Sequence, residues 1–272
     1  MNLQIDNQLE VCSMMRSGHH AVLYWLFGQI DHMIYFKDDI LRYANKELEG
    51  ALIGGGDISS VIKTYVYNIE DAPIDKIEYL REKYKTRFEI CAPKKRRSVM
   101  IIRDPFNMFA SRYRLFLRIN RIRLEDGKAP FAESRNTNEN SNITWIDKNA
   151  VNLWKIYAKE FLGYSNHLGS DVLKINYNKW FSNILYRKEI SENMNLKFSD
   201  KKLNYVPENG HGSSFDVRSL DGSAQKMDVL NRWRRFSGNK KFKSIFSDKE
   251  MINLSLEIYP DLTKDIIEEL GL

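Results

Sequence analysis

The stretch from Leu9 to Phe27 constrains the fold more than any other part of the sequence. A short apolar run ends at Ser13, a turn with Arg16 and Gly18 follows, and an amphipathic pattern then begins. This order predicts a strand, a tight loop and a helix. Such a junction directs several unpaired backbone N–H groups, and the positive end of the helix dipole, at one point. We therefore expect a phosphate or a sulfate to bind there, with side-chain donors from Arg16 and Ser17.

The loop is not a Walker A motif. That motif requires G-x-x-x-x-G-K-S/T, whereas His19 and His20 follow Gly18 here and no glycine lies five residues upstream. The segment instead resembles the loop with which sulfotransferases hold the 5′-phosphosulfate of PAPS (3′-phosphoadenylyl sulfate). That loop has a basic residue, Ser or Thr, Gly, and two small or polar residues that open a helix. The resemblance implies that five consecutive residues bind the cofactor: Arg16, Ser17, Gly18, His19 and His20.

The elements that follow predict an α/β fold. A second strand is expected at 61–67, a helix from residue 75 and a third strand at 98–102, whereas 33–36 reads as a short apolar piece within a connection. This alternation is typical of a parallel sheet with right-handed crossovers. A helix at 146–167, a fourth strand at 172–177 and helices at 228–236, 248–259 and 262–270 complete the prediction. We expect a three-layer fold with a mainly parallel central sheet, similar to the P-loop-NTPase-like fold of sulfotransferases.

A second anion site is expected where the third strand ends. Arg103 stands at that end, Asp104 and Pro105 start a helix, and Ser111 lies two turns along it. Ligands of open α/β sheets collect just past the carboxyl ends of the strands. Sulfotransferases carry an Arg at a strand end and a Ser eight residues later, and this pair holds the 3′-phosphate of PAPS. The resemblance implies the same role for Arg103 and Ser111.

A glycine- and hydroxyl-rich segment at 210–215 is the third part of the resemblance, which extends from about residue 9 to 236. In sulfotransferases a late glycine-rich segment closes over the adenosine and 3′-phosphate, and its equivalents here are Gly212, Ser213 and Ser214. The chain thus resembles the PAPS-dependent sulfotransferase family, closer to its carbohydrate and bacterial branch. The implied reaction moves a sulfuryl group from PAPS to a hydroxyl or amine of a saccharide, glycolipid or small alcohol, leaving PAP, the 3′,5′-bisphosphate.

The catalytic residues implied by the resemblance are Glu70, Arg16 and His20. The family usually has Lys at the position of Arg16, and because Arg does not pass a proton we expect a purely electrostatic role. Glu70 is the first candidate for the base, as in the carbohydrate branch, with Asp71, Tyr65 and His20 as alternatives. Tyr65 replaces the histidine of the cytosolic branch and, with a reference pKa of about 10, is a poor base. Glu70 and Asp71 also fit a structural role beside the dipole of the next helix.

No metal is expected. Adjacent histidines such as His19 and His20 point about 100° apart on a helix. The sequence has no Cys, His or Glu partner for them at the spacing typical of zinc ligands.

Composition limits the remaining possibilities. The chain has 272 residues, 43% of them hydrophobic, a net charge of +6 and a pI of about 9.1. The length allows one large α/β domain or two small ones, and we expect a single domain over 1–272. The charge favours an anionic partner. The polar run at 127–142 predicts a lid-like loop at about 125–145. No apolar run long enough for a membrane span and no signal peptide are visible, and Cys12 and Cys91 read as reduced, buried residues. We expect a cytoplasmic protein, and a peripheral membrane contact stays open.

Two other functions remain as alternatives. The first is an ATP-dependent kinase on the same sheet, which the missing Walker lysine and magnesium-binding hydroxyl disfavour. The second is a non-enzymatic basic protein that binds RNA or another polyanion with strong salt dependence. Nucleic acid is not the expected ligand, and the sequence leaves the acceptor and the oligomeric state open.

Overall fold

A central six-stranded sheet organises the part of the chain that the structure describes. The computed structural model describes residues 6–41, 51–53, 62–85, 94–130, 148–208 and 212–272. The strand order is β3-β2-β4-β1-β5-β6, and every neighbouring pair is parallel except β2 with β3. The strands are β1 (Asn7–Ser13), β2 (Ile34–Lys37), β3 (Ala51–Ile53), β4 (Thr64–Glu70), β5 (Lys95–Ile102) and β6 (Leu173–Asn176).

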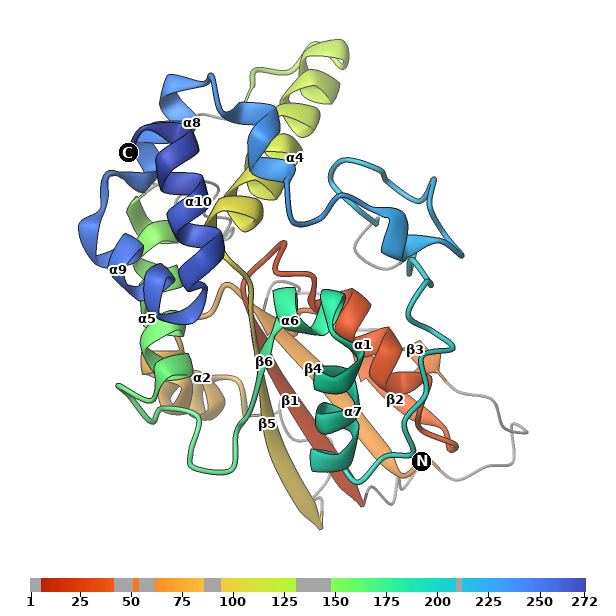
Figure 1. Ribbon diagram of the computed structural model, residues 1–272. Coiled ribbons are helices and arrows are strands. Elements are labelled where there is room, and N and C mark those ends of the chain that lie inside the picture. The colour runs from red at the N-terminus through yellow and green to blue at the C-terminus, as the bar shows by residue number, and fades with distance from the viewer. Residues whose placement is uncertain (1–5, 42–50, 54–61, 86–93, 131–147, 209–211) are drawn as a thin grey trace.

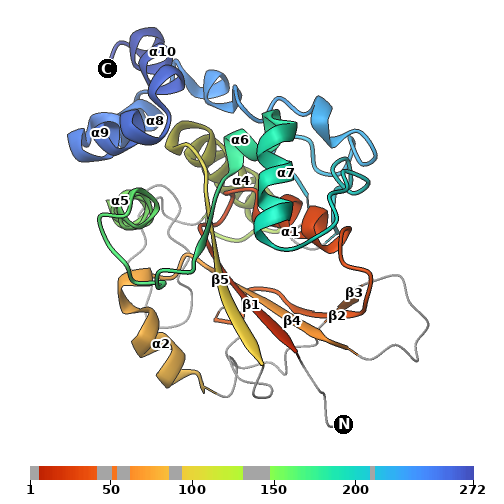
Figure 2. The same cartoon turned by 60° about the horizontal axis from the view of Figure 1, so that its bottom comes forward.

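Helices cover both faces of this sheet, so the predicted three-layer α/β architecture is confirmed (Figures 1 and 2). One face packs against α1 (His19–Phe27), α6 (Tyr177–Ser182) and α7 (Ile184–Asn193). The other face packs against α2 (Ile77–Lys83), α4 (Pro105–Glu125) and α5 (Lys148–Leu162). The C-terminal helices α8 (Lys240–Ser244), α9 (Lys249–Ile258) and α10 (Pro260–Leu270) extend this second layer beside α5. Four short 3-10 turns are η1 (Ile74–Lys76), η3 (Ala224–Lys226), η4 (Arg232–Phe236) and η5 (Ile245–Ser247).

The central strands are apolar on both sides because each face meets a helical layer. In β1, Val11 belongs to the core on the α1 side, and the next residue, Cys12, belongs to the core on the α5 side. Val99 and Met100 divide in the same way in β5. This alternation explains why these strands read as continuous apolar runs in the sequence. Among the described helices, none has the length and apolar character needed to cross a bilayer.

Several predicted boundaries were wrong. Residues 34–37 form a strand because Ile34 and Phe36 turn inward while Tyr35 pairs with Tyr65 of β4, a pattern too short to recognise in the sequence. The third strand begins at Lys95, so the basic run enters the sheet beside β1. Tyr177 begins α6 rather than ending a strand, because Asn176 caps that helix through the Lys179 N–H at 3.1 Å.

The expected C-terminal helix at 228–236 is shortened to η4, whereas the other two C-terminal helices are confirmed as α9 and α10. The expected lid begins at the last residue of α4, and from 131 to 145 it lies outside the described residues. Cys91, Gly210 and the glycine turn at 54–56 also lie outside them.

The start of α4 confirms the prediction at Asp104 and Pro105. The Asp104 carboxylate accepts the N–H of Asn107 at 2.8 Å, and Pro105 occupies the first helical position, where no N–H is needed. This cap fixes α4 directly behind the end of β5. Arg103 therefore lies at the carboxyl end of β5, two residues before the helix that carries Ser111.

The sheet contains a buried carboxylate, and the contribution of its ion pair to the free energy of unfolding can be measured. Glu10 of β1 is fully buried and accepts hydrogen bonds from Arg81 (Nε, 3.1 Å) and Tyr67 (Oη, 2.9 Å). We predict that Arg81→Met lowers the free energy of unfolding by about 3–5 kcal/mol, because it leaves a buried charge without its cation. Urea denaturation at neutral pH measures this loss.

Glu78→Gln is the matched control, since Glu78 is the other carboxylate paired with Arg81 and its side chain is 79% exposed. It should change the same quantity by less than about 0.5 kcal/mol. Equal effects of the two substitutions would contradict the assignment of Glu10 as a buried charge that depends on Arg81.

Candidate active site

The loop between β1 and α1 has the conformation of an anion-binding turn. Arg16 and Gly18 have φ values of +68° and +86°, and Gly18 caps α1. The Ser17 N–H closes the turn on the carbonyl oxygen of Met14 at 3.0 Å. The first N–H groups of α1, those of His19 and His20, have no acceptor within the helix. The predicted strand, loop and helix are confirmed, and their geometry presents these donors at one end of the sheet.

A buried ion pair supports this loop from behind. The Asp71 carboxylate accepts the Met15 N–H at 2.9 Å and pairs with Arg112, whose Nε donates to the Met15 carbonyl oxygen at 3.0 Å. Burial raises the pKa of Asp71 above its usual value even though Arg112 opposes this shift. Both donors to the Asp71 carboxylate, the Met15 N–H and the Arg112 guanidinium, belong to the loop and to α4, so Asp71 holds these two segments together. The alternative that Asp71 is the catalytic base stays a prediction.

Tyr65 is unsuited to that role. It is buried in the core and packs between the rings of Tyr35 and Tyr67.

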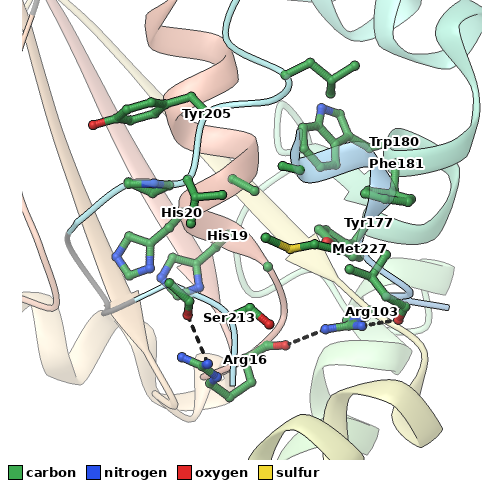
Figure 3. Close-up of a pocket in the computed structure, with 18 of the residues that line it drawn as sticks. Arg16, His19, His20, Arg103, Tyr177, Trp180, Phe181, Tyr205, Ser213 and Met227 are labelled. Atoms are coloured by element: carbon green, nitrogen blue, oxygen red, sulfur yellow. Dashed lines mark hydrogen bonds between the residues drawn. The ribbon is translucent and has the colours of Figure 1, made fainter. Parts of the chain in front are cut away.

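The two predicted anion-binding segments open on one cavity. Arg16 and Arg103 both line it, and Arg103 Nη1 donates to the carbonyl oxygen of Arg16 at 3.2 Å (Figure 3). Arg103 also lies over the ring of Tyr177, with its Cζ atom 4.9 Å from the ring centroid. Besides Arg103, six residues predicted to bind the cofactor line this cavity: Arg16, Gly18, His19, His20, Gly212 and Ser213.

Arg232 joins the second anion-binding segment, and the sequence analysis missed it. Its Nη1 donates to Ser111 Oγ at 3.2 Å, and Arg103 Nη1 approaches the same hydroxyl at 3.5 Å. Its Nη2 donates to Ser213 Oγ at 2.7 Å and lies 3.3 Å from Asp216. The basic run at 232–235 was visible in the sequence, but only the 3-10 turn shows that Arg232 is the buried member.

The cavity contains buried arginine side chains whose positive charge is only partly balanced by neighbouring carboxylates. Burial and the neighbouring Arg232 lower the pKa of Arg16 to about 9, and burial and Arg103 lower the pKa of Arg232 to about 10. The buried Nε atoms of Arg103 and Arg232 have no hydrogen-bond partner within the described residues. Buried donors of this kind are almost always satisfied in proteins, so their clustering favours an anionic ligand.

Two predicted hydroxyls lie beside the cavity rather than on its surface. Ser17 Oγ and Ser214 Oγ are buried and, in the part of the chain described, have no hydrogen-bond partner. The segment that carries Ser214 is folded back on itself, because Ser213 and Val217 exchange two backbone hydrogen bonds of 2.9 and 3.0 Å. Arg16 Nη2 reaches the Gly212 carbonyl oxygen of this segment at 3.1 Å. The cavity is thus bridged by residues 212–217.

The rest of the cavity wall is apolar and largely aromatic. It is formed by α6 and by the segments before and after the 212–217 turn: Tyr177, Trp180, Phe181, Leu203, Tyr205, Val206, Met227 and Val229. Ligand pockets typically combine such a wall with a few polar anchoring groups. This composition suits a flat heterocycle attached to anionic groups.

Glu70 belongs to a cluster of two histidines and two carboxylates at the edge of this site. His19 Nε2 lies 2.9 Å from Glu70 Oε1, and His20 Nε2 lies 3.0 Å from both carboxylate oxygens of Asp38. Asp38 follows β2 and Glu70 ends β4. Because these neighbouring strands are parallel, both carboxylates lie at the carboxyl ends of the strands, where α1 begins. Figure 3 shows the two imidazole rings side by side above Arg16.

The ionisation of the cluster follows from this pairing. Burial alone would raise the pKa of Asp38, but His20 outweighs it and lowers the pKa to about 2. Burial likewise opposes the lowered pKa of Glu70, which His19 brings about. The donor atoms of all four residues lie within 4.8 Å of one another. The expectation that the histidines have no partner at ligand distance was therefore wrong, because Asp38 and Glu70 approach them through the fold.

Comparison with known proteins supports the fold. No protein-family model and no curated protein sequence matches the chain. The structure is similar to the sulfotransferase domain of the Synechococcus PCC 7002 olefin synthase, with a TM-score of 0.50 and 11% sequence identity over 94% of this chain and 96% of that one. The chain has a sulfotransferase fold. Mouse sulfotransferase SULT7A1 complexed with PAP aligns over 97% of this chain and 90% of that one, with a TM-score of 0.47 and 14% identity.

The contact with Tyr177 places a strict demand on Gly18. An added Cβ there would overlap the Tyr177 ring, and φ is +86°. Gly163 has a similar φ of +83°, but its added Cβ would meet nothing within 4 Å. We predict that Gly163→Ala loses only the roughly 1–2 kcal/mol of left-handed backbone strain, whereas Gly18→Ala lowers the free energy of unfolding further. Denaturant unfolding of both variants measures the difference, and equal losses would show that the loop does not pack against Tyr177.

Proposed function

We propose that this chain is a sulfotransferase that moves a sulfuryl group from PAPS to a hydroxyl or amine of an acceptor. The observation that carries the proposal is the pair of cationic segments, at the ends of β1 and β5, on one cavity with an aromatic wall. A nucleoside with phosphate groups at both ends of its ribose complements this arrangement. The sulfotransferase fold supports the same conclusion.

Each end of the donor has its own binding group in this proposal. The 5′-phosphosulfate lies at the start of α1, bound by Arg16, Ser17 and the backbone N–H groups of residues 18–20. The 3′-phosphate lies between Arg103, Ser111 and Arg232. Gly212, Ser213 and Ser214 lie over the nucleoside, and the aromatic wall packs against its base.

Catalysis then follows from fixed charges. As the acceptor oxygen bonds to sulfur, the bond from sulfur to the 5′-phosphate oxygen breaks and negative charge develops on the departing PAP. Arg16 and the loop N–H groups are already directed at that charge, and a preorganised donor of this kind is typically worth roughly 10²–10³ in rate. Glu70, at the end of β4 beside His19 and with His20 next in the cluster, takes the proton of the acceptor.

The acceptor class follows from the resemblance and not from the cavity. We propose a saccharide, a glycolipid or a small alcohol. The donor, the acceptor and the base of this proposed reaction can each be tested in a separate experiment.

The first test is binding of PAP by calorimetry. We predict that the protein binds PAP without added metal and that Arg103→Ala or Arg232→Ala weakens binding by at least about 10-fold, since a charge-assisted hydrogen bond is worth roughly 1.5–3 kcal/mol. Arg235→Ala is the matched control, because Arg235 lies in the same 3-10 turn and is exposed. It should leave PAP affinity unchanged.

The same titration separates the alternatives. Binding of ATP with magnesium but not of PAP would favour the kinase. Salt-sensitive binding of RNA together with indifference to PAP would favour the polyanion-binding protein. Either result overturns the proposal.

The second test concerns the base. With radiolabelled PAPS and an acceptor selected from a panel of saccharides, glycolipids and small alcohols, Glu70→Gln should lower kcat by about 10²–10⁴, the usual contribution of general base catalysis. PAP affinity should be unchanged, because Glu70 lies outside the proposed phosphate-binding residues. A Glu70→Gln enzyme with the parent kcat would exclude Glu70 as the base.

A further inference from the structure

We propose that His19, His20, Asp38 and Glu70 together bind one divalent transition-metal ion of the zinc type. The four residues come from three separate parts of the chain, yet one donor atom of each lies within 4.8 Å of all the others. Two imidazoles and two carboxylates form a ligand set that zinc accepts. Metal binding here goes beyond the sulfotransferase activity and can be tested without it.

The hydrogen bonding of His19 points to a ligand. Its side chain is 4% exposed, and neither ring nitrogen has a hydrogen-bond partner among the described residues. Its Nε2 lies 2.9 Å from Glu70 Oε1, a hydrogen-bond distance, but the two groups are not aligned as donor and acceptor. A buried imidazole nitrogen that faces a carboxylate oxygen at this ion-pair distance, without an aligned hydrogen bond, is placed where both atoms can bind one ion.

The distances agree with this interpretation. In a tetrahedral zinc site with bonds of about 2.0–2.2 Å, neighbouring donor atoms lie roughly 3.3–3.5 Å apart. The contacts of 2.9 and 3.0 Å and the 4.8 Å limit bracket that value. Only small side-chain shifts are required, since the backbone of each ligand is set by α1 or by the ends of β2 and β4.

Charge and ligand type favour a transition metal over magnesium. With neutral imidazoles, Asp38 and Glu70 give the cluster a charge of −2, which a divalent ion balances. Arg16 also interacts electrostatically with Glu70 and with His20. Its positive charge therefore offsets part of the negative charge of the two carboxylates. Imidazole nitrogen suits zinc and its neighbours in the transition series, whereas magnesium prefers oxygen ligands and retained waters.

The site leaves the proposed donor binding intact. His19 and His20 offer their backbone N–H groups to the phosphosulfate, while their side chains turn toward Asp38 and Glu70. The phosphosulfate and the ion are then held by different atoms of the same two residues.

The role of the ion rests on the proposed function. An acceptor hydroxyl bound to the ion has a lowered pKa. It gives its proton to the Glu70 oxygen that does not bind the ion, and the resulting oxygen bonds to sulfur as the bond from sulfur to PAP breaks. The ion would thus place the acceptor beside the phosphosulfate and make it a nucleophile near neutral pH.

The experiment is a zinc titration of the untagged, full-length chain after dialysis against a chelator. We expect one Zn²⁺ per chain by calorimetry and elemental analysis, and for the cobalt-loaded protein the visible absorption of four-coordinate Co²⁺. His19→Ala and Asp38→Asn should each weaken zinc binding by more than the roughly 10–100-fold typical of losing an outer-shell partner. His167→Ala is the matched control, since it removes an exposed histidine outside the cluster and should leave zinc binding unchanged.

The outcomes separate this proposal from the sulfotransferase assignment. No stoichiometric zinc in the parent protein, or equal losses in His19→Ala and His167→Ala, overturns the metal site. Asp38→Asn, which preserves the shape of the side chain, keeps the test decisive if circular dichroism shows that His19→Ala fails to fold. Zinc binding without PAP binding would support the metal site and overturn PAPS as the donor. PAP binding without zinc binding would support the donor and overturn the metal site.

Discussion

The ion pair between Asp71 and Arg112 is the contact on which the geometry of the whole site depends. Each residue of this contact is the immediate neighbour of a residue proposed to act in the site. Asp71 follows Glu70, Arg112 follows Ser111, and Met15, which both of them bind, precedes Arg16. One buried contact therefore sets the relative positions of the proposed base, the 3′-phosphate residue and the 5′-phosphate loop. Removing one partner would leave the other charge buried without compensation, so all three segments depend on this pair.

The cavity concentrates charge at the expense of stability. Burying Arg16, Arg103 and Arg232 near one another disfavours the folded protein. The lowered pKa values of Arg16 and Arg232 indicate this cost. The surrounding structure compensates with the Asp216 carboxylate and with neutral acceptors: the carbonyl oxygens of Arg16, Gly212 and Val229 and the hydroxyl of Ser111. Local conflicts of this kind, inside an otherwise consistent fold, are expected at functional sites.

The parts of the site that sequence reasoning found are those that local chemistry specifies. A strand followed by Arg16, Ser17 and Gly18, and Arg103 followed by the Asp104 cap, are complete within a dozen residues each, so pattern and capping rules suffice. Arg232 and Asp38 were missed because nothing local distinguishes them. Arg232 is one of three arginines in a short turn, and burial alone selects it. Asp38 follows a four-residue strand whose partner, β4, lies about thirty residues away in sequence, and only the register of that pair brings Asp38 to Glu70.

The turn at 212–217 has a consequence for how a ligand enters and leaves. Arg16 and Arg232 reach across the cavity to the Gly212 carbonyl oxygen and the Ser213 hydroxyl. A phosphate that enters the cavity finds Arg232 Nε without a hydrogen-bond partner within the described residues, so it gains at least this contact without displacing one that the protein already makes. The contacts to Gly212 and Ser213 hold the turn against the same two arginines, so loss of either contact would loosen the cover of the cavity.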